Sequence, residues 1–199
     1  GLSAGVGAVS AGCLLVVALL QGDQTIAFML AALIGSLLGF LKYNWHPARI
    51  YMGDTGAMFI GLLLGAMTMI EQYPSDHPLS LLTPVFILGI PIFDTLFVMY
   101  IRYRRGLPIF WGSPDHIAIR LRHWGMSVPQ IVITSYVATA VVGLVGLAML
   151  SVSEDVAWAL CAGTASTFLL VTAMLAKVDV RRPGLAVAPS PHGEGTKAA

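Results

Sequence analysis

An aspartate between two glycines is the first feature of this sequence that could do chemistry. The segment YMGDTGAMF places Asp54 between Gly53 and Gly56, directly before a long apolar run. Glycines let backbone N–H groups come close to an anion, and a carboxylate is a hard oxygen ligand of the kind that Mg²⁺ takes. The same carboxylate could instead cap the following helix, at the positive end of its dipole. The residues indicate either a metal or phosphate site or a helix cap, and they leave both open.

A second carboxylate, Asp94, lies inside an apolar segment, PIFDTLFVMYIRYRRG. It is about two helical turns from the basic end of that segment. A carboxylate at this depth in a membrane costs on the order of 2–3 kcal/mol, and such residues usually face the interior of a helix bundle. A hydrogen bond to a serine or threonine of another helix is the structural alternative. Pro91, three residues earlier, is expected to kink the helix. Asp94 is therefore a candidate catalytic residue together with Asp54.

Arginines follow Asp94 at the end of the same apolar segment. Arg102, Arg104 and Arg105 lie within four positions of one another. Guanidinium groups beside carboxylates suit a polyanionic substrate, because they bind phosphate oxygens in pairs. Anchoring of a helix end at the membrane surface is enough to explain at least one of them.

A short amphipathic helix is expected after the arginine cluster. In the segment GSPDHIAIRLRHWG, Ser113 is a predicted N-cap, Pro114 the first helical residue and Gly125 the stop. His116 and Arg120 lie one turn apart on its polar side. A helix of this kind could simply lie on the bilayer surface. The alternative is that His116 and Arg120 contact a substrate.

The elements that must position these residues are membrane-spanning helices. The 199 residues are 57% hydrophobic and only 11% charged, with a mean hydropathy of +0.81. A soluble domain carries about 25% charged residues. A helix that crosses a bilayer core about 30 Å thick needs an apolar run of about 20 residues, and this sequence has several runs of about that length. We predict an all-α, polytopic transmembrane helix bundle with about six spans and one short amphipathic helix outside the membrane. The predicted spans are 3–20, 25–43, 56–72, 80–101, 128–150 and 156–176.

The basic residues fall on alternate connections only. Lys42, at the end of the second predicted span, and Arg49, in the loop after it, are two of the eleven Lys and Arg; the stretch 102–127 holds five and the tail from Lys177 holds four. The positive-inside rule then makes these connections cytoplasmic, and with them the amphipathic helix. We expect residues 1–180 to form one transmembrane domain and the Pro- and Gly-rich tail, 181–199, to be disordered.

The order of these motifs resembles that of the polyprenyl-phosphate N-acetylhexosamine-1-phosphate transferases. GFLKYNWHPARIYMGDTGAMFIG is similar to the family's stretch in which Asn and Pro-Ala precede Met-Gly-Asp-x-Gly. PIFDTLFVMYIRYRRGLPIF is similar to its Pro-x-x-Asp followed by Arg and a Gly-x-x-Pro-Phe-like turn, and DHIAIRL to its His-containing motif. GLSAGVGAVSAG resembles the start of the helix that follows the family's Asp-Gly-x-Asp-Gly segment. The resemblance covers nearly everything except the tail, and the three ordered motifs together make it specific.

The resemblance implies a reaction and a cofactor. A polyprenyl phosphate, undecaprenyl phosphate in bacteria, attacks the β-phosphate of a UDP-N-acetylhexosamine, giving a polyprenyl-diphosphate-sugar and UMP with Mg²⁺ required. It implies catalytic roles for Asp54 and Asp94, an association of Asp54 with Mg²⁺, and contact of His116 with the nucleotide sugar. The expected substrate-binding residues are Asn44, Arg102, Arg105, His116 and Arg120.

The resemblance also implies a setting for the protein. It places the protein in the bacterial inner membrane with its active face cytoplasmic, serving cell-envelope glycans such as peptidoglycan or lipopolysaccharide. The expected partners are the nucleotide sugar, the polyprenyl phosphate, membrane lipid and a second copy in a homodimer. No nucleic acid is expected.

Two departures from the family pattern qualify the expectation of activity. The usual motif reads His-x-His-His-Arg-Leu, whereas this chain has His116, then Ile-Ala-Ile, then Arg120. The family's paired aspartates belong upstream of Gly1, so we expect this chain alone to be inactive. The alternatives are a transporter in which Asp94 relays ions, and a truncated membrane fragment without catalysis. Polar residues gathered at one face, with no internal repeat, favour the transferase over the transporter.

Overall fold

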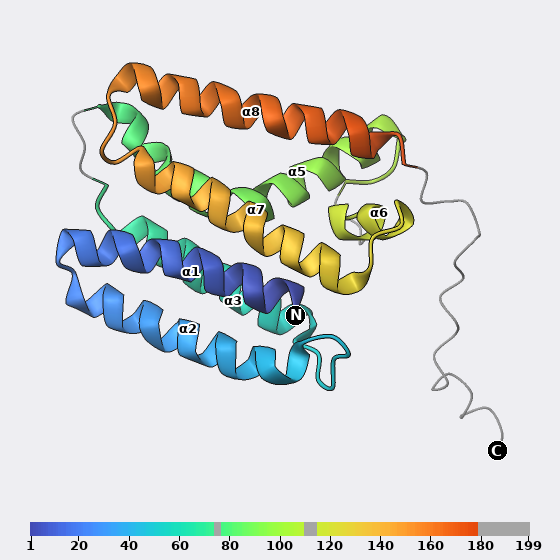
Figure 1. Cartoon of the computed structure of the whole chain (residues 1–199), viewed down its shortest axis with the longest axis horizontal. Helices are drawn as coiled ribbons and strands as arrows, with labels where there is room; N and C mark the ends of the chain where they lie inside the picture. Colours follow the sequence, from blue (N-terminus) through green and yellow to red (C-terminus); the bar gives the residue numbers. More distant parts are fainter. Residues whose placement is uncertain (74–76, 110–114, 179–199) are drawn as a thin grey trace.

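The computed structural model describes residues 1–73, 77–109 and 115–178. Within these ranges the chain is helical and contains no strand, which confirms the predicted all-α bundle. The helices lie lengthwise beside one another (Figure 1). The predicted tail, 181–199, and Ser113 itself lie outside the described residues, but the helix predicted to start there begins only at Ile117, with His116 as its N-cap. In chain order the elements are α1 (Leu2–Gln21), α2 (Gln24–Asn44), α3 (Gly53–Ile70), the 3-10 helix η1 (Pro78–Leu82), α4 (Thr83–Ile87), α5 (Gly89–Arg104), α6 (Ile117–His123), α7 (Val128–Ala148) and α8 (Glu154–Ala176).

Five of these helices are long and apolar enough to cross a membrane: α1, α2, α3, α7 and α8. The residues of the sixth predicted span form a bent pair, Pro78–Ile87 and Gly89–Arg104, whose axes differ by 76°, so the pair is either one broken span or a re-entrant loop. The span expected over 80–101 is therefore not one continuous helix. The kink expected at Pro91 lies instead at Leu88, and Pro91 is the third residue of the helix that starts after it. A proline there removes only an N–H that the first turn leaves unpaired.

Neighbouring helices accommodate the break between α4 and α5. Ser10 of α1 donates its hydroxyl to the carbonyl oxygen of Ile87 at 3.0 Å, which pairs a backbone group at the end of α4. Pairing of this kind is required of irregular backbone at membrane depth. Gly89 lies so close to α7 that a Cβ there would be 2.8 Å from Cγ1 of Val142. The bend is a packed feature of the bundle.

Helix α1 is the centre of the bundle and packs against α2, α3 and α7. Its sequence is rich in Gly, Ala and Ser, and 56% of its membrane-length window is buried. Small residues let helix backbones approach closely where lipid provides no hydrophobic driving force. The hydroxyl of Tyr136, on α7, donates to the carbonyl oxygen of Gly1 at 2.6 Å and fixes the register of the two helices.

The two ends of the bundle carry opposite charge. Every Lys and Arg of the described chain lies at the end where α2, α5 and α8 finish and α3, α6 and α7 begin, on the right in Figure 1. We call this the basic end. The other end, where α1 and α3 finish and α8 begins, is the acidic end. Its described charged residues are Asp23, Glu71, Glu154 and Asp155. The basic and acidic connections that alternate along the sequence therefore lie at opposite ends of the bundle.

Candidate active site

Asp94 and His116, both predicted as site residues, are joined directly. Oδ2 of Asp94 lies 2.8 Å from Nδ1 of His116. Oδ1 of Asp94 accepts the backbone N–H of Ile117 at 2.9 Å. Ile117 is the first residue of α6, so a carboxylate on α5 caps a helix that begins 23 residues later. The expected alternative, a bond to a serine or threonine, is replaced by a histidine and a helix N-terminus.

The environment of His116 favours its charged form. The hydrogen bond to Asp94 raises the pKa of His116, burial lowers it, and the negative charges of Asp94 and Asp115 raise it further. Half of the His116 side chain is exposed. The imidazolium form donates Nδ1–H to Asp94, so the ring presents its Nε2–H outward. A hydrogen-bond donor with positive charge at this place suits a phosphate group.

A buried ion cluster lies immediately behind His116. Oδ1 of Asp115 accepts from Arg105 at 2.8 Å and from Arg120 at 2.9 Å. The Arg120 side chain is completely buried, and it also donates to the carbonyl oxygens of Leu175 at 3.0 Å and Val178 at 2.7 Å. Arg120 thereby ties α6 to the end of α8. Its contacts are those of a positioning residue, whereas Arg105 keeps a quarter of its side chain exposed.

Arg102 and Asn44, also expected to bind substrate, order loops at the basic end. Nε of Arg102 donates to the carbonyl oxygen of Pro108 at 2.6 Å, and the residue is buried. Nδ2 of Asn44 donates to the carbonyl oxygen of Ile50 at 2.7 Å and is likewise buried. The Asn44 contact closes the loop that leads into α3. Any contact of these two side chains with substrate stays a prediction.

Asp54 is at the same end but stands apart from the Asp94–His116 pair. It lies in the first turn of α3, is exposed, and accepts no hydrogen bond within the described residues. Met52, and not Asp54, occupies the N-cap position, so the expected role as a side-chain cap does not hold. Gly53 takes a φ of 69°, a conformation that glycine adopts at no steric cost. The structure leaves the Asp54 carboxylate open to solvent and to ligands.

The carboxylates at the basic end can be compared with the ligands that Mg²⁺ requires. Within the described ranges, no three His, Cys, Asp or Glu residues come close enough together to hold a metal ion. Mg²⁺ does not require such a cage, because it keeps several waters and commonly binds one or two carboxylates plus substrate phosphates. The exposed Asp54 fits that description as a single protein ligand.

Asp115 is the residue of this region that the sequence did not single out. It precedes His116 in the segment PDHIAIRL and there looks like another polar residue of a surface helix. Its importance comes from Arg105, ten residues away, and from the buried Arg120. The sequence shows that Asp115 lies close to Arg120, but it does not show that both side chains are buried.

A family model and several known proteins match this chain in sequence. The family model of glycosyl transferase family 4 matches residues 1–72, which include Asn44 and Asp54. A Bacillus subtilis protein described as a probable undecaprenyl-phosphate N-acetylglucosaminyl 1-phosphate transferase is 38% identical over 136 residues. That match covers 68% of this chain, so it reaches beyond residue 72, and 38% of the relative.

Two further relatives carry related names. A phospho-N-acetylmuramoyl-pentapeptide-transferase of Desulforudis audaxviator is 35% identical over 151 residues, which are 74% of this chain and 42% of that protein. A decaprenyl-phosphate N-acetylglucosaminephosphotransferase of Mycobacterium leprae is 34% identical over 161 residues, covering 71% of this chain and 40% of that protein. The matches span about two fifths of these relatives' own lengths. No solved structure matches the chain.

Proposed function

Because the chain belongs, over the part that it spans, to glycosyl transferase family 4, we propose that it contributes to a membrane enzyme that transfers a sugar 1-phosphate. In the proposed reaction an oxygen of a polyprenyl phosphate attacks the β-phosphorus of a UDP-N-acetylhexosamine. The bond from the β-phosphorus to the bridging oxygen breaks, and UMP leaves with that oxygen. The products are UMP and a polyprenyl-diphosphate-sugar, so atoms and charge balance.

The observation that carries the proposal is the set of groups at the basic end. An exposed carboxylate at the start of a membrane-spanning helix, Asp54, shares this end with the Asp94–His116 pair and with Arg105. Both proposed substrates are polyanions, and one is a lipid. Their phosphates must meet where the membrane surface gives way to water, and one end of a bundle of membrane-length helices suits that position.

The chain's own residues divide the work as follows. His116, held by Asp94, and the exposed part of Arg105 bind and orient the diphosphate of the nucleotide sugar. Arg120 and Asp115 hold these two side chains in place from behind. Asp54 would hold a Mg²⁺ ion, which when bound offsets negative charge on the phosphates.

The bend between α4 and α5 supports a lipid substrate. An apolar cavity of about 160 Å³ lies beside it, between α4, α5, α7 and α8. Its walls include Phe86, Gly89, Val142 and Phe168. A cavity of this lining at membrane depth suits a section of a polyprenyl chain.

The proposal includes the sidedness and the membrane. The clustering of all described Lys and Arg at one end supports a cytoplasmic basic end by the positive-inside rule. The bacterial relatives support the inner membrane. The proposed sugar is an N-acetylhexosamine as a class, because the relatives' names include both N-acetylglucosamine and phospho-N-acetylmuramoyl-pentapeptide.

The proposal is tested with membranes that contain the gene product carrying this chain. UDP-N-acetylglucosamine labelled in the sugar, undecaprenyl phosphate and Mg²⁺ are added, and UMP and labelled lipid are measured. We expect equimolar UMP and labelled lipid, and loss of both in Asp54→Asn. The variant Asp155→Asn, at the acidic end, is the matched control and should behave as the wild type. Labelled lipid formed at the wild-type rate by Asp54→Asn would contradict the assignment of Asp54.

A further inference from the structure

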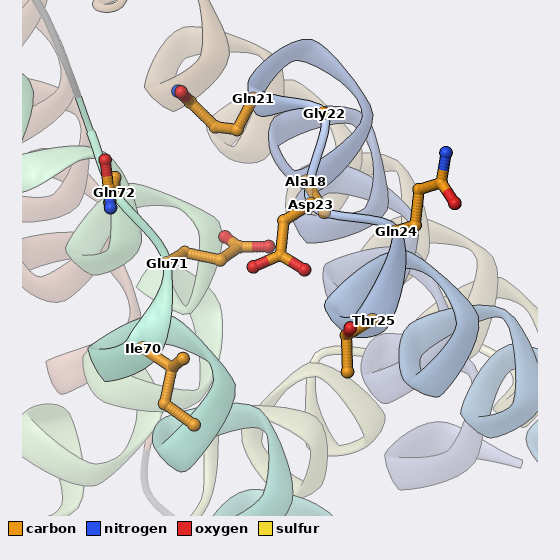
Figure 2. A pocket seen from close by; sticks show the side chains of 9 residues that line it. All are labelled: Ala18, Gln21, Gly22, Asp23, Gln24, Thr25, Ile70, Glu71 and Gln72. Atoms are coloured by element: carbon orange, nitrogen blue, oxygen red, sulfur yellow. The ribbon is translucent and has the colours of Figure 1, made fainter.

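A polar cavity lies at the acidic end, at the opposite end of the bundle from the proposed active site. Its volume is about 520 Å³, and it lies between the α1–α2 turn and the end of α3 (Figure 2). None of its lining residues is Lys, Arg or His. The oxygen-bearing side chains among them are Gln21, Asp23, Gln24, Thr25, Glu71 and Gln72.

Glu71 is the unusual residue of this cavity. Only 8% of it is exposed, although it is a carboxylate directly after the last turn of α3. Oε2 accepts the hydroxyl of Tyr73 at 3.3 Å, but the buried Oε1 has no hydrogen-bond partner within the described residues. Leaving a buried acceptor unpaired costs about 1–3 kcal/mol, and more when the group is charged. Such an atom therefore calls for a partner that the described residues do not supply.

The other carboxylate of the cavity, Asp23, faces Glu71. Figure 2 shows the two side chains pointing toward one another from the two sides of the cavity. Oδ1 of Asp23 accepts the backbone N–H of Ile26 at 3.1 Å and caps α2. The Asp23 carboxylate is therefore fixed in place.

The charges around the cavity are mainly negative. Helices α1 and α3 both end here with partial negative charge, whereas the partially positive start of α2 is capped by Asp23, so the Glu71 carboxylate faces no cationic side chain among the lining residues. Burial raises the pKa of Glu71 to about 7, the Tyr73 hydrogen bond lowers it, and the charge of Asp23 raises it.

From the unpaired Oε1, the facing carboxylates and the oxygen-rich lining, we infer that this cavity binds a hard divalent cation. The carboxylates of Glu71 and Asp23 are the anionic ligands, and water completes the shell, because the amides of Gln21 and Gln24 point away from the two carboxylates in Figure 2. Ca²⁺ takes about 6–8 oxygen ligands in flexible geometry and tolerates water among them, which suits a polar cavity that offers two carboxylates. The inference is independent of the proposed transferase function, which uses the basic end.

A cation here would join two connections that are far apart in sequence. Asp23 lies in the α1–α2 turn and Glu71 follows α3, so one ion bound by both cross-links three helices at the acidic end. We expect a bound cation to raise the unfolding temperature and to slow amide exchange at these two connections.

The test is a calorimetric titration of the full chain in detergent micelles with CaCl₂. The chain carries Asp54→Asn, so that the proposed Mg²⁺ ligand at the basic end cannot contribute. We expect one saturable site with a Kd on the order of 10⁻⁴–10⁻³ M, as in extracellular Ca²⁺ modules. Glu71→Gln in this background should weaken binding at least tenfold. Glu154→Gln, which removes an exposed carboxylate at the same end, should leave the Kd unchanged.

A second variant keeps the inference testable if Glu71→Gln is poorly folded. Asp23→Asn retains a good N-cap residue, and it too should weaken Ca²⁺ binding. The absence of saturable binding of Ca²⁺ would overturn the inference and leave a proton shared by the two carboxyl groups as the explanation. An unchanged Kd in both Glu71→Gln and Asp23→Asn would overturn it equally.

Discussion

The two ends of the bundle treat buried charge in opposite ways. At the basic end Asp115 is held between Arg105 and Arg120, and Asp94 is bonded to His116 and to a helix N-terminus. At the acidic end Glu71 is buried as Asp115 is, yet its Oε1 has no partner within the described residues.

The difference separates groups that build the molecule from groups that await a ligand. Satisfied charges such as Asp115 and Arg120 position neighbouring elements, and truncating one partner leaves the other buried and unpaired. Unsatisfied or exposed carboxylates, Glu71 and Asp54, are the ones free to take a cation. By this criterion the reactive surface of the basic end is Asp54 with the exposed side of His116.

The largest expected effect comes from breaking the satisfied cluster. Asp115→Asn removes the negative charge shared by Arg105 and the fully buried Arg120, so we expect a loss of about 3–5 kcal/mol in unfolding free energy. Denaturant unfolding in detergent micelles measures it. Asp155→Asn is the exposed control and should stay within about 0.5 kcal/mol of the wild type. Equal stability of the two variants would refute the structural role of the cluster.

The second largest effect is expected from a substitution in the loop before α3. Asn44→Ala removes the hydrogen bond to the carbonyl oxygen of Ile50 and costs about 1–3 kcal/mol locally. The loop then opens more often, and tryptic cleavage after Arg49 should speed up about tenfold, since 1.4 kcal/mol is a factor of ten. Tyr51→Ala changes an exposed residue of the same loop and serves as the control. Unchanged cleavage in Asn44→Ala would mean that the loop is held by other contacts.

At the acidic end, replacing a buried carboxylate should raise the unfolding free energy instead of lowering it. With divalent cations removed by EDTA at pH 8, Glu71→Gln replaces an uncompensated buried carboxylate by a neutral amide that can donate to Asp23. We expect a gain of about 1 kcal/mol in unfolding free energy, against the loss in Asp115→Asn. The same unfolding assay gives both values. A loss at Glu71 as large as that at Asp115 would remove the contrast between the two ends.

The smallest expected effect is the pH dependence of the α5–α6 contact. Asp94 raises the pKa of His116, so the pair stabilises the folded state fully below the unfolded pKa near 6.5 and loses this as pH rises through the folded pKa. Half of the His116 side chain is exposed, so solvent screening keeps the effect below about 1 kcal/mol.

Amide exchange of α6 measures this effect. After correction for intrinsic rates, residues 117–123 should exchange faster at pH 8 than at pH 6. His116→Gln should abolish the difference, and His123→Gln should preserve it. A pH dependence that survives in His116→Gln would assign it to another group.

Much of the fold was predictable because bilayer thickness imposes long apolar runs. Helix α1 was expected over 3–20 and spans Leu2–Gln21, and α7 was expected over 128–150 and spans Val128–Ala148. The spacing of Ser127 and Gln130 is that of a capping box, and both of its hydrogen bonds are present at the start of α7. The bend at Leu88 could not be predicted, because hydropathy carries no information on the direction of a helix axis. Ser10, on a helix distant in sequence, also helps to accommodate the bend.

The site was predictable in its residue types but not in their pairing. Asp94 stood out as a carboxylate in apolar sequence, Asp54 by its flanking glycines, and His116 by its place on the polar side of a short helix. That Asp94 meets His116, and that Arg120 is completely buried, depends on how α5, α6 and α8 pack. The Glu71–Asp23 pair gave even less signal, because acidic residues between spans are ordinary until one of them proves to be buried.

The central claim is that chemistry belongs to the basic end, and one comparison of rates tests it most directly. UMP release is measured for Asp54→Asn and Asp94→Asn, and for Glu154→Gln and Asp155→Asn at the acidic end, in the gene product carrying this chain at equal amounts of folded protein. We predict that the first two fall by about a hundredfold or more and that the last two stay within about twofold of the wild type. Activity retained in Asp54→Asn and Asp94→Asn, or lost as strongly in the acidic-end variants, would contradict the account.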